Sequence, residues 1–313
     1  MLQQGIKGFV PVMLTPFDAS GRIDFDGLQR LTEFYIDSGA SSLFANCLSS
    51  EMYELSPEER IRVTSQVIKF AGDRVPVVST GNFPGAQQEQ IEFIHRLADT
   101  GVEAIILTTS MLATPGENDR VLRDRVYQLL DATTGIQFGF YECPEPYKRL
   151  LAPELLGDFV RTGRVIYHKD TSLDINHVRE KLKHAGDSSF GLYDAYMVHA
   201  VESLQAGAAG LSCIQGNYFP ELIVWICRNY ANADRKNELD TVMNSIRQNM
   251  DLMHRFYPES AKYFLQERGI EIDTFTRKQQ AERLDNQSRQ EMRQLLDELS
   301  NICQMLELDL VSG

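Results

Sequence analysis

A lysine ends a short apolar run at residues 165–170 (VIYHKD). The run is too short for a helix, and its Val, Ile and Tyr residues favour a buried strand. The side chain of Lys169 must therefore either reach water or occupy an enclosed site that lowers its pKa. Because only a neutral amine attacks a carbonyl group, an enclosed lysine suits Schiff-base chemistry. An ordinary solvated lysine at a strand end is the alternative.

Eight short apolar runs recur along the chain, and amphipathic segments separate them. The runs predicted as strands are residues 9–14, 42–47, 75–80, 104–109, 137–143, 165–169, 190–194 and 210–215. The segments predicted as helices are residues 25–38, 57–71, 85–100, 118–132, 153–161, 175–185 and 196–205. This alternation implies a parallel sheet, and eight units match the (β/α)8 TIM barrel of the α/β class. An open sheet of six or seven strands is the alternative, but the chain has no GxGxxG or GxxxxGK[ST] nucleotide motif.

The pattern becomes helical only after residue 220. Predicted helices follow at residues 221–231, 237–256, 260–267 and 286–308. We interpret residues 1–220 as a (β/α)8 catalytic barrel. Residues 221–313 are predicted to form a C-terminal helical extension that packs on the barrel instead of folding as an independent domain.

The composition is that of a soluble globular protein, with 43% hydrophobic and 24% charged residues. The net charge of −13 argues against a nucleic-acid or anionic membrane surface as partner. Five cysteines without CxxC spacing fit a reducing compartment better than a disulfide framework. No signal-like or membrane-length apolar run is present, so we expect a cytoplasmic protein.

The carboxyl ends of barrel strands form the mouth where active sites lie. Lys169 and Tyr141 end two neighbouring predicted strands, and a phenol beside an amine can move protons during imine formation. Ser49 and Ser50 follow the second strand, where hydroxyl and backbone N–H groups can hold a carboxylate. His168 precedes the lysine, so strand alternation points its ring away from the barrel interior and towards a helix.

Other polar residues at the mouth have more than one interpretation. Asp194 and Asn217 can bind substrate hydroxyls, or cap the helices that follow them. Cys47, Cys143 and Cys213 end three strands, yet no histidine stands at ligand spacing, so no metal is expected.

With these motifs in this order, the chain resembles the dihydrodipicolinate synthase / N-acetylneuraminate lyase family of class I pyruvate-dependent aldolases. The resemblance extends over essentially the whole chain. Each motif is weak alone, but their order and spacing across a barrel are specific. The matching motifs are residues 12–18 (VMLTPFD), 21–24 (GRID), 56–60 (SPEER), 141–144 (YECP), 167–170 (YHKD), 207–212 (GAAGLS) and 217–220 (NYFP).

The resemblance implies roles for individual residues. Lys169 matches the lysine that forms an imine with the keto carbon of pyruvate or another 2-keto acid, and Tyr141 matches the tyrosine that moves protons there. The family's GTTGE or GSTGE loop falls on residues 47–51, where Ser49 matches the hydroxyl residue that binds the carboxylate and Ser50 replaces a glycine. The resemblance implies that backbone amides near Ser49 and Ser50 assist in binding this carboxylate. Such chemistry needs no cofactor.

Several positions depart from the family pattern. Leu48 replaces the hydroxyl residue that relays protons to the tyrosine, and Met111 or Leu112 stands where a neighbouring subunit often adds another tyrosine. The substrate-binding arginine of dihydrodipicolinate synthases aligns with Pro146, and Arg149 is out of register. These departures argue against lysine biosynthesis and favour a substrate such as a 2-keto-3-deoxy sugar acid. Water or the substrate carboxylate must then move protons, unless Glu142 contributes; a solvated or salt-bridged Glu142 is the alternative.

The predicted function is a Schiff-base lyase, either an aldolase or a dehydratase, that acts on a small 2-keto acid. The loss of the relay residues motivates an alternative, a non-catalytic paralogue that binds a sugar acid or serves as an assembly subunit. A third possibility is a metal-dependent barrel enzyme. The resemblance also implies a homo-oligomer, a dimer or a tetramer.

Overall fold

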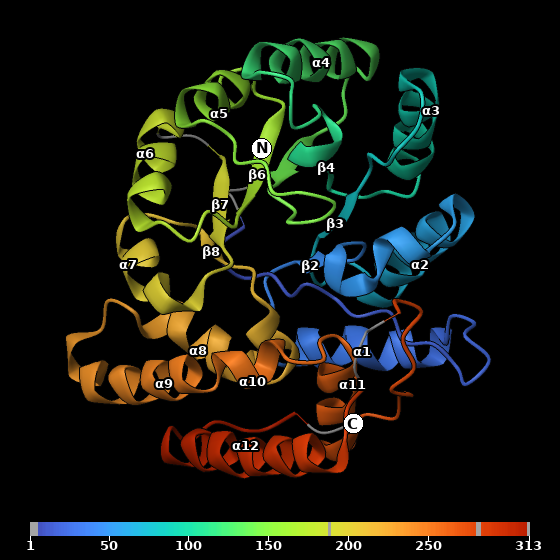
Figure 1. Cartoon of the computed structure of the whole chain (residues 1–313). Coiled ribbons are helices and arrows are strands. Elements are labelled where there is room, and N and C mark those ends of the chain that lie inside the picture. Colours follow the sequence, from blue (N-terminus) through green and yellow to red (C-terminus); the bar gives the residue numbers. More distant parts are fainter. Residues whose placement is uncertain (1–5, 187–188, 280–282, 312–313) are drawn as a thin grey trace.

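Eight parallel strands form the centre of the molecule (Figure 1). The computed structural model describes residues 6–186, 189–279 and 283–311. Along the sheet the strands follow the order β1-β8-β7-β6-β5-β4-β3-β2. Their bounds are β1 Gly8–Phe9, β2 Leu43–Phe44, β3 Val77–Thr80, β4 Ala104–Thr108, β5 Phe138–Tyr141, β6 Val165–Asp170, β7 Gly191–Asp194 and β8 Gly210–Leu211. Each predicted apolar run therefore overlaps a strand, although the run at residues 9–14 shares only Phe9 with β1.

The two edges of the sheet meet and close the barrel. The segment after β1 pairs with β2 through a parallel bridge between Val12 and Phe44. On the other side β1 pairs directly with β8, where a Cβ atom on Gly210 would lie 1.7 Å from the carbonyl oxygen of Gly8. Only glycine permits this approach of two backbones. The predicted (β/α)8 barrel is confirmed, and the open sheet is wrong.

Helices cover the outside of the ring. Their bounds are α1 Phe25–Asp37, α2 Pro57–Ala71, α3 Gln87–Ala98, α4 Asp119–Ala132, α5 Pro153–Val160, α6 Ile175–Ala185, α7 Ala200–Gln205 and α8 Pro220–Asn229. Because α8 packs against β1 and β8, its position is that of the eighth outer helix of a barrel. We therefore propose that the C-terminal extension begins after Asn229, nine residues later than the predicted boundary.

The extension contains α9 Lys236–Gln248, α10 Met250–His254, α11 Glu259–Glu267 and α12 Asn286–Met305. Figure 1 shows these helices together on one side of the barrel. The single helix predicted over residues 237–256 is wrong, because it is interrupted at Asn249. The side-chain amide of Asn249 donates to the backbone oxygen of Ser245 at 2.9 Å, a local bond that competes with helix continuation.

Strand alternation divides the side chains of β6 between two environments. Tyr167 lies in the apolar cluster inside the barrel and stacks on Tyr193 with 4.6 Å between ring centroids. His168 and Asp170 point outwards to α6, as predicted for His168. Lys169, between them, therefore points inwards.

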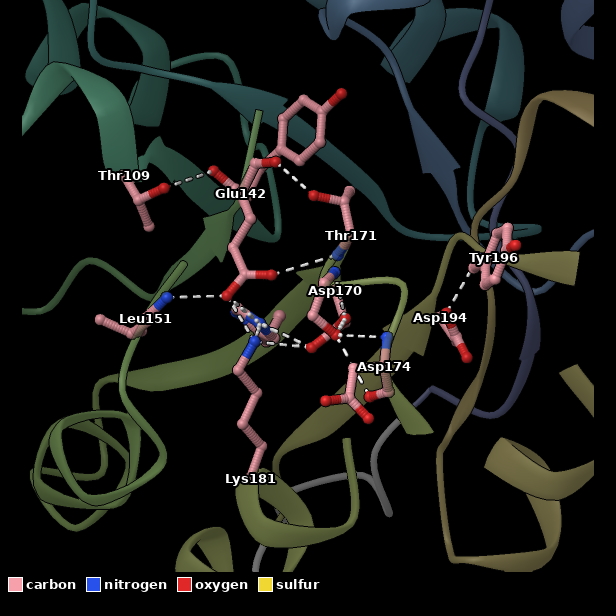
Figure 2. A network of polar contacts seen from close by, with 12 residues as sticks. Thr109, Glu142, Leu151, Asp170, Thr171, Asp174, Lys181, Asp194 and Tyr196 are labelled. Carbon is pink, nitrogen blue, oxygen red and sulfur yellow. Dashed lines mark hydrogen bonds and ion pairs between the residues drawn. The ribbon is translucent and has the colours of Figure 1, made fainter. Parts of the chain in front are cut away.

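A buried charge network lies on the outer side of β5 and β6 (Figure 2). The ammonium group of Lys181, on α6, forms ion pairs with Glu142 and Asp170 and lies 3.2 Å from Nε2 of His168. The Glu142 carboxylate also accepts hydrogen bonds from the backbone N–H groups of Leu151 at 2.8 Å and Thr171 at 3.1 Å. The network thus ties α6 to the strands that carry Tyr141 and Lys169.

Burial alone would raise the pKa of both carboxyl groups in this network. The charge of Lys181 and the contact from His168 outweigh that effect, and the pKa values of Glu142 and Asp170 are lowered. Both carboxyl groups are therefore ionised at neutral pH. The ammonium group of Lys181 offsets the cost of burying these two negative charges.

Lys181→Met should strongly destabilise the protein, because it leaves two buried carboxylates without a cation. Removing one partner of a buried ion pair typically costs about 3–5 kcal/mol. Urea unfolding at neutral pH measures the loss. Lys183→Met on the same helix is the matched control, because its ion pair with Glu180 is exposed and its removal should leave the unfolding free energy nearly unchanged. Equal effects of the two substitutions would contradict a structural role for the network.

Candidate active site

The amine of Lys169 lies inside the barrel against a phenol ring. Lys169 pairs in register with Tyr141 of β5 on one side and Tyr193 of β7 on the other. Its side chain is 4% exposed, and Nζ lies 4.4 Å from the centroid of the Tyr141 ring. Within the part of the chain that the structure describes, Nζ has neither a hydrogen bond nor a carboxylate partner. The enclosed environment, one of the two that the sequence left open, is the one observed.

Burial lowers the pKa of Lys169, and the nearby thiols of Cys47, Cys143 and Cys213 only oppose this shift. Thiols are mostly protonated at neutral pH, so they supply little compensating charge. The amine is consequently neutral in a larger fraction of molecules than a surface lysine would be. This is the form that adds to a carbonyl group.

Tyr141 is arranged to act as an acid. Burial raises the pKa of its phenol well above the ordinary value, so the group is protonated at neutral pH. Tyr141 lies in the same apolar cluster as Cys143, inside the barrel. A proton donor therefore stands beside the amine, where a departing hydroxyl group would need one.

The two serines after β2 have different surroundings. Ser50 is fully buried, and its hydroxyl oxygen lies 2.6 Å from the backbone oxygen of Met13 and 2.7 Å from that of Ala45. Its backbone N–H donates to the oxygen of Cys47 at 3.0 Å. Ser50 thus holds the loop to the segments that directly follow β1 and β2. Ser49 is 5% exposed, and it lowers the pKa of Tyr257, which burial raises well above the ordinary value.

Tyr257 is contributed by the C-terminal extension. Asn217 donates from Nδ2 to the Tyr257 hydroxyl at 2.6 Å and to the backbone oxygen of Val12 at 2.9 Å, and its Oδ1 accepts from Tyr35 at 2.6 Å. The side-chain amide of Asn217 is therefore hydrogen-bonded to other protein groups at both its nitrogen and its oxygen. Sequence reasoning did not find Tyr257, because a tyrosine that follows a helix belongs to no motif and only the fold brings it to the barrel mouth.

Asp194 is also engaged by its own loop, as Figure 2 shows for its contact with Tyr196. Its Oδ1 accepts the backbone N–H of Tyr196 at 2.9 Å, and its Oδ2 lies 2.9 Å from Nε2 of His199. Burial disfavours a charged His199, but the Asp194 carboxylate outweighs burial and raises the pKa of the imidazole. The carboxylate thus holds the turn after β7. It does not cap a helix, as one interpretation of the sequence had it, because Tyr196 and His199 occupy the N-cap positions of the helical turns that follow.

The extension also anchors the loop that carries Ser49. Glu51, at the end of that loop, adopts a left-handed backbone conformation with φ 57° and is buried. Its carboxylate accepts from Nζ of Lys262, on α11, at 2.8 Å and from the backbone N–H of Lys278 at 2.8 Å. This buried ion pair offsets the cost of an unusual backbone conformation and sets where the loop lies.

The positions that depart from the family pattern bring no charge to the mouth. Leu48 packs on the apolar cluster that contains Tyr141, and Leu112 is buried in another. The guanidinium group of Arg149 is directed to the start of α4, where it pairs with Asp119 at 2.8 Å. Glu142 faces α6, so the salt-bridged alternative holds and the solvated one does not.

Metal-ligand spacing is found at one place among the described residues, the group of Glu142, His168 and Asp170. The ammonium group of Lys181 contacts all three of these side chains. A cation is thus already supplied by the chain at this point.

In the described part of the chain, no helix combines the length and the apolar character needed to cross a membrane.

Solved structures with the same fold share little sequence with this chain. A prophage protein of the dihydrodipicolinic acid synthase family from E. coli K12, in complex with pyruvate, aligns with a TM-score of 0.83 and 21% identity over 94% of this chain and 98% of that chain. Dihydrodipicolinate synthase from Acinetobacter baumannii, also with pyruvate, aligns with a TM-score of 0.82 and 22% identity over 94% and 99%. At this identity the likeness concerns the fold alone.

Comparison of sequences identifies the family as well as the fold. A 4-hydroxy-tetrahydrodipicolinate synthase of Shewanella baltica is 29% identical over 243 residues, which cover 77% of this chain and 81% of that protein. The profile of the Dihydrodipicolinate synthetase family matches residues 5–299. Because this match includes both barrel and extension, the chain belongs to the Dihydrodipicolinate synthetase family, whose members are class I lyases.

Proposed function

We propose that this protein is a class I lyase in which Lys169 forms a Schiff base with the keto carbon of pyruvate or a related 2-keto acid. The observation that carries the proposal is a buried amine that has no counter-ion among the described residues and lies 4.4 Å from the centroid of a tyrosine ring. Membership of a family of class I lyases supports it. No cofactor is required, because condensation with the lysine nitrogen turns the keto carbon of the substrate into an electrophilic iminium carbon.

The remaining residues have complementary roles in this proposal. Tyr141 donates a proton when water leaves the carbinolamine. Its phenolate then accepts the hydroxyl proton of the substrate when an aldol bond breaks, or the C3 proton in a dehydration, where that proton passes to the departing hydroxyl group. Ser49, which neighbours Tyr257, binds the carboxylate of the keto acid. Ser50, Asn217 and Asp194, first predicted as substrate ligands, instead hold the loops that surround the site.

For the substrate we propose a 2-keto-3-deoxy sugar acid. Three buried side-chain oxygens have no hydrogen-bond partner among the described residues: those of Thr15 and Gln215, which follow β1 and β8, and that of Thr80, which ends β3. Unpaired buried oxygens of this kind suit a ligand that carries several hydroxyl groups. The absence of an arginine at Pro146 argues against a second carboxylate at that place. A screen of 2-keto-3-deoxy acids for pyruvate release tests the assignment.

A non-catalytic paralogue that binds a sugar acid or acts as an assembly subunit is the second candidate. The apolar surroundings of Leu48 favour it, because that position carries no hydroxyl to move protons. Binding of a sugar acid without turnover or covalent trapping would support this function over catalysis. In either case we expect a homo-oligomer, a dimer or a tetramer, in the cytoplasm.

Incubation of the protein with pyruvate and borohydride should produce a stable adduct on Lys169, identified by peptide mass spectrometry. Lys169→Ala should abolish the adduct and turnover, because no other buried amine faces Tyr141 in the described residues. Lys183→Ala, an exposed control, should be labelled as fully as the unchanged protein. An unlabelled Lys169 at saturating pyruvate would refute the imine mechanism.

The rate of imine trapping should rise with pH and reach half its plateau below pH 10.5, the ordinary pKa of lysine. Only the neutral amine reacts, and burial lowers the pKa of Lys169, so the reactive form appears at lower pH than on a surface lysine. Cyanoborohydride trapping across a pH series provides the profile, with a lysine-containing peptide as reference. A midpoint equal to that of the peptide would contradict the proposed environment.

Tyr141→Phe should reduce the turnover of an accepted substrate by roughly two to four orders of magnitude, the usual contribution of a positioned acid–base group. The ring that packs on Lys169 is retained, so loss of rate reports on the hydroxyl. Steady-state kinetics measure it, and Tyr127→Phe on α4 serves as the control. A reduction below tenfold would assign the proton transfer to another group.

A further inference from the structure

The C-terminal extension reaches the barrel mouth through an irregular segment after α11, residues 272–278, which we call the strap. The backbone oxygen of Phe275 in the strap accepts from Nζ of Lys262 at 2.7 Å. The backbone N–H of Lys278 donates to the buried carboxylate of Glu51 at 2.8 Å. Since Glu51 ends the loop that carries Ser49, these contacts hold the strap against the mouth.

Two neighbouring cations of the strap have different surroundings. The guanidinium group of Arg277 donates to the carboxylate of Glu59 at 2.7 and 2.8 Å, and its Nε donates to the backbone oxygen of Gly21 at 2.9 Å. The ammonium group of Lys278 has a single partner among the described residues, a carboxylate oxygen of Glu145. Arg277 thus anchors the strap, whereas Lys278 retains unused donors.

Glu145 lies at the rim of the mouth, four residues after Tyr141, which ends β5. Its backbone oxygen accepts the hydroxyl of Tyr53 at 3.0 Å and that of Ser110 at 3.3 Å. The Tyr53 hydroxyl also lies 3.8 Å from Sγ of Cys143, a member of the apolar cluster that contains Tyr141. Glu145 therefore stands directly outside the cluster that holds the proposed acid.

The ion pair of Lys278 and Glu145 is accessible from solvent. The two side chains are 37% and 43% exposed. Two hydrogens of the ammonium group and the second carboxylate oxygen have no partner in the described part of the chain. An ammonium group donates and a carboxylate accepts, so together they can bind both the oxygen and the hydrogen of a hydroxyl group. Because the two charges compensate each other, the pair suits uncharged hydroxyls better than a further charged group.

We propose that the Lys278–Glu145 pair is an outer subsite that binds the distal hydroxyl groups of the substrate, and so selects long 2-keto-3-deoxy sugar acids over acids without these groups. This inference rests on the proposed Schiff-base function. The unpaired oxygens of Thr15, Thr80 and Gln215 are almost completely buried and suit hydroxyls close to the keto carbon. The half-exposed pair at the rim suits the far end of the same chain.

Two other cations follow β5 and are less suited to this role. The guanidinium group of Arg149 is directed to α4, where it pairs with Asp119 at 2.8 Å. Nζ of Lys148 donates to the backbone oxygen of Thr171 at 2.8 Å and has no carboxylate partner among the described residues. Lys148 therefore brings a donor without an acceptor, whereas the ion pair of the strap brings both.

Two 2-keto acids that form an imine but react no further isolate this binding. The acid 5,6-dihydroxy-2-oxohexanoate carries distal hydroxyls and 2-oxohexanoate does not, and neither has the C4 hydroxyl that aldol cleavage or dehydration requires. Each acid is trapped on Lys169 by cyanoborohydride over a range of concentrations, and peptide mass spectrometry measures the concentration at which the labelling rate is half maximal. The ratio of the two concentrations is the preference for distal hydroxyls.

The unchanged full-length protein should prefer the dihydroxy acid about tenfold or more, because a hydrogen bond to a charged group contributes on this scale. Lys278→Met and Glu145→Ala should each remove most of this preference. Lys278→Arg should keep it to within about threefold, because the charge and the donors remain. Lys183→Met, on the exposed side of α6, and Lys148→Met are the matched controls and should retain the full preference. Thermal unfolding confirms that each variant is folded.

The outcomes distinguish the subsite from the function on which it rests. A preference that persists in Lys278→Met and Glu145→Ala, or that is absent from the unchanged protein, refutes the subsite and leaves the imine mechanism intact. Equal weakening of both acids also refutes it, because a strap that only supports the mouth would affect every keto acid alike. If the unchanged protein gives no adduct on Lys169 even with pyruvate, the proposed function fails and the subsite with it.

Discussion

The structure depends on the separation of charge across a single strand. Lys169 points into the barrel, where a phenol and thiols surround it, and Asp170 points outwards to the ammonium group of Lys181. The alternation of side chains along a strand makes this division possible. If Asp170 shared the face of Lys169, an ion pair would keep the amine protonated and unreactive. The outer network thus keeps carboxylates away from the amine while it holds the same strand in place.

The C-terminal extension completes the barrel mouth as well as covering the outside. Its α11 supplies Lys262, which binds Glu51 and sets the loop that carries Ser49, and Tyr257 reaches Asn217 and Ser49. These contacts join segments far apart in the sequence at one end of the barrel. A division of the chain into a catalytic barrel and an appended extension therefore understates how much the site depends on the extension.

The family match and the departures from it concern different parts of the site. The amine and the phenol, Lys169 and Tyr141, stand in register on neighbouring strands, and the fold of the family supports that arrangement. The surroundings of the phenol differ, with Leu48 apolar and Cys143 and Tyr53 in contact beside it. A thiol accepts and donates more weakly than a hydroxyl, but it fits an apolar cluster that would not readily accommodate a more polar group.

The sequence by itself determined the eight strands, most of the helices, and the inward direction of Lys169, because hydrophobic periodicity and strand alternation are local properties. It also indicated Tyr141 beside the lysine, since neighbouring parallel strands end at the same edge. Only the tertiary structure decided which polar groups are free. Asn217 and Ser50 are occupied by Tyr257 and by the backbone of Met13, partners that no local pattern specifies. The reason is physical: a hydrogen bond between distant segments depends on how helices and loops pack, and packing is a property of the whole fold.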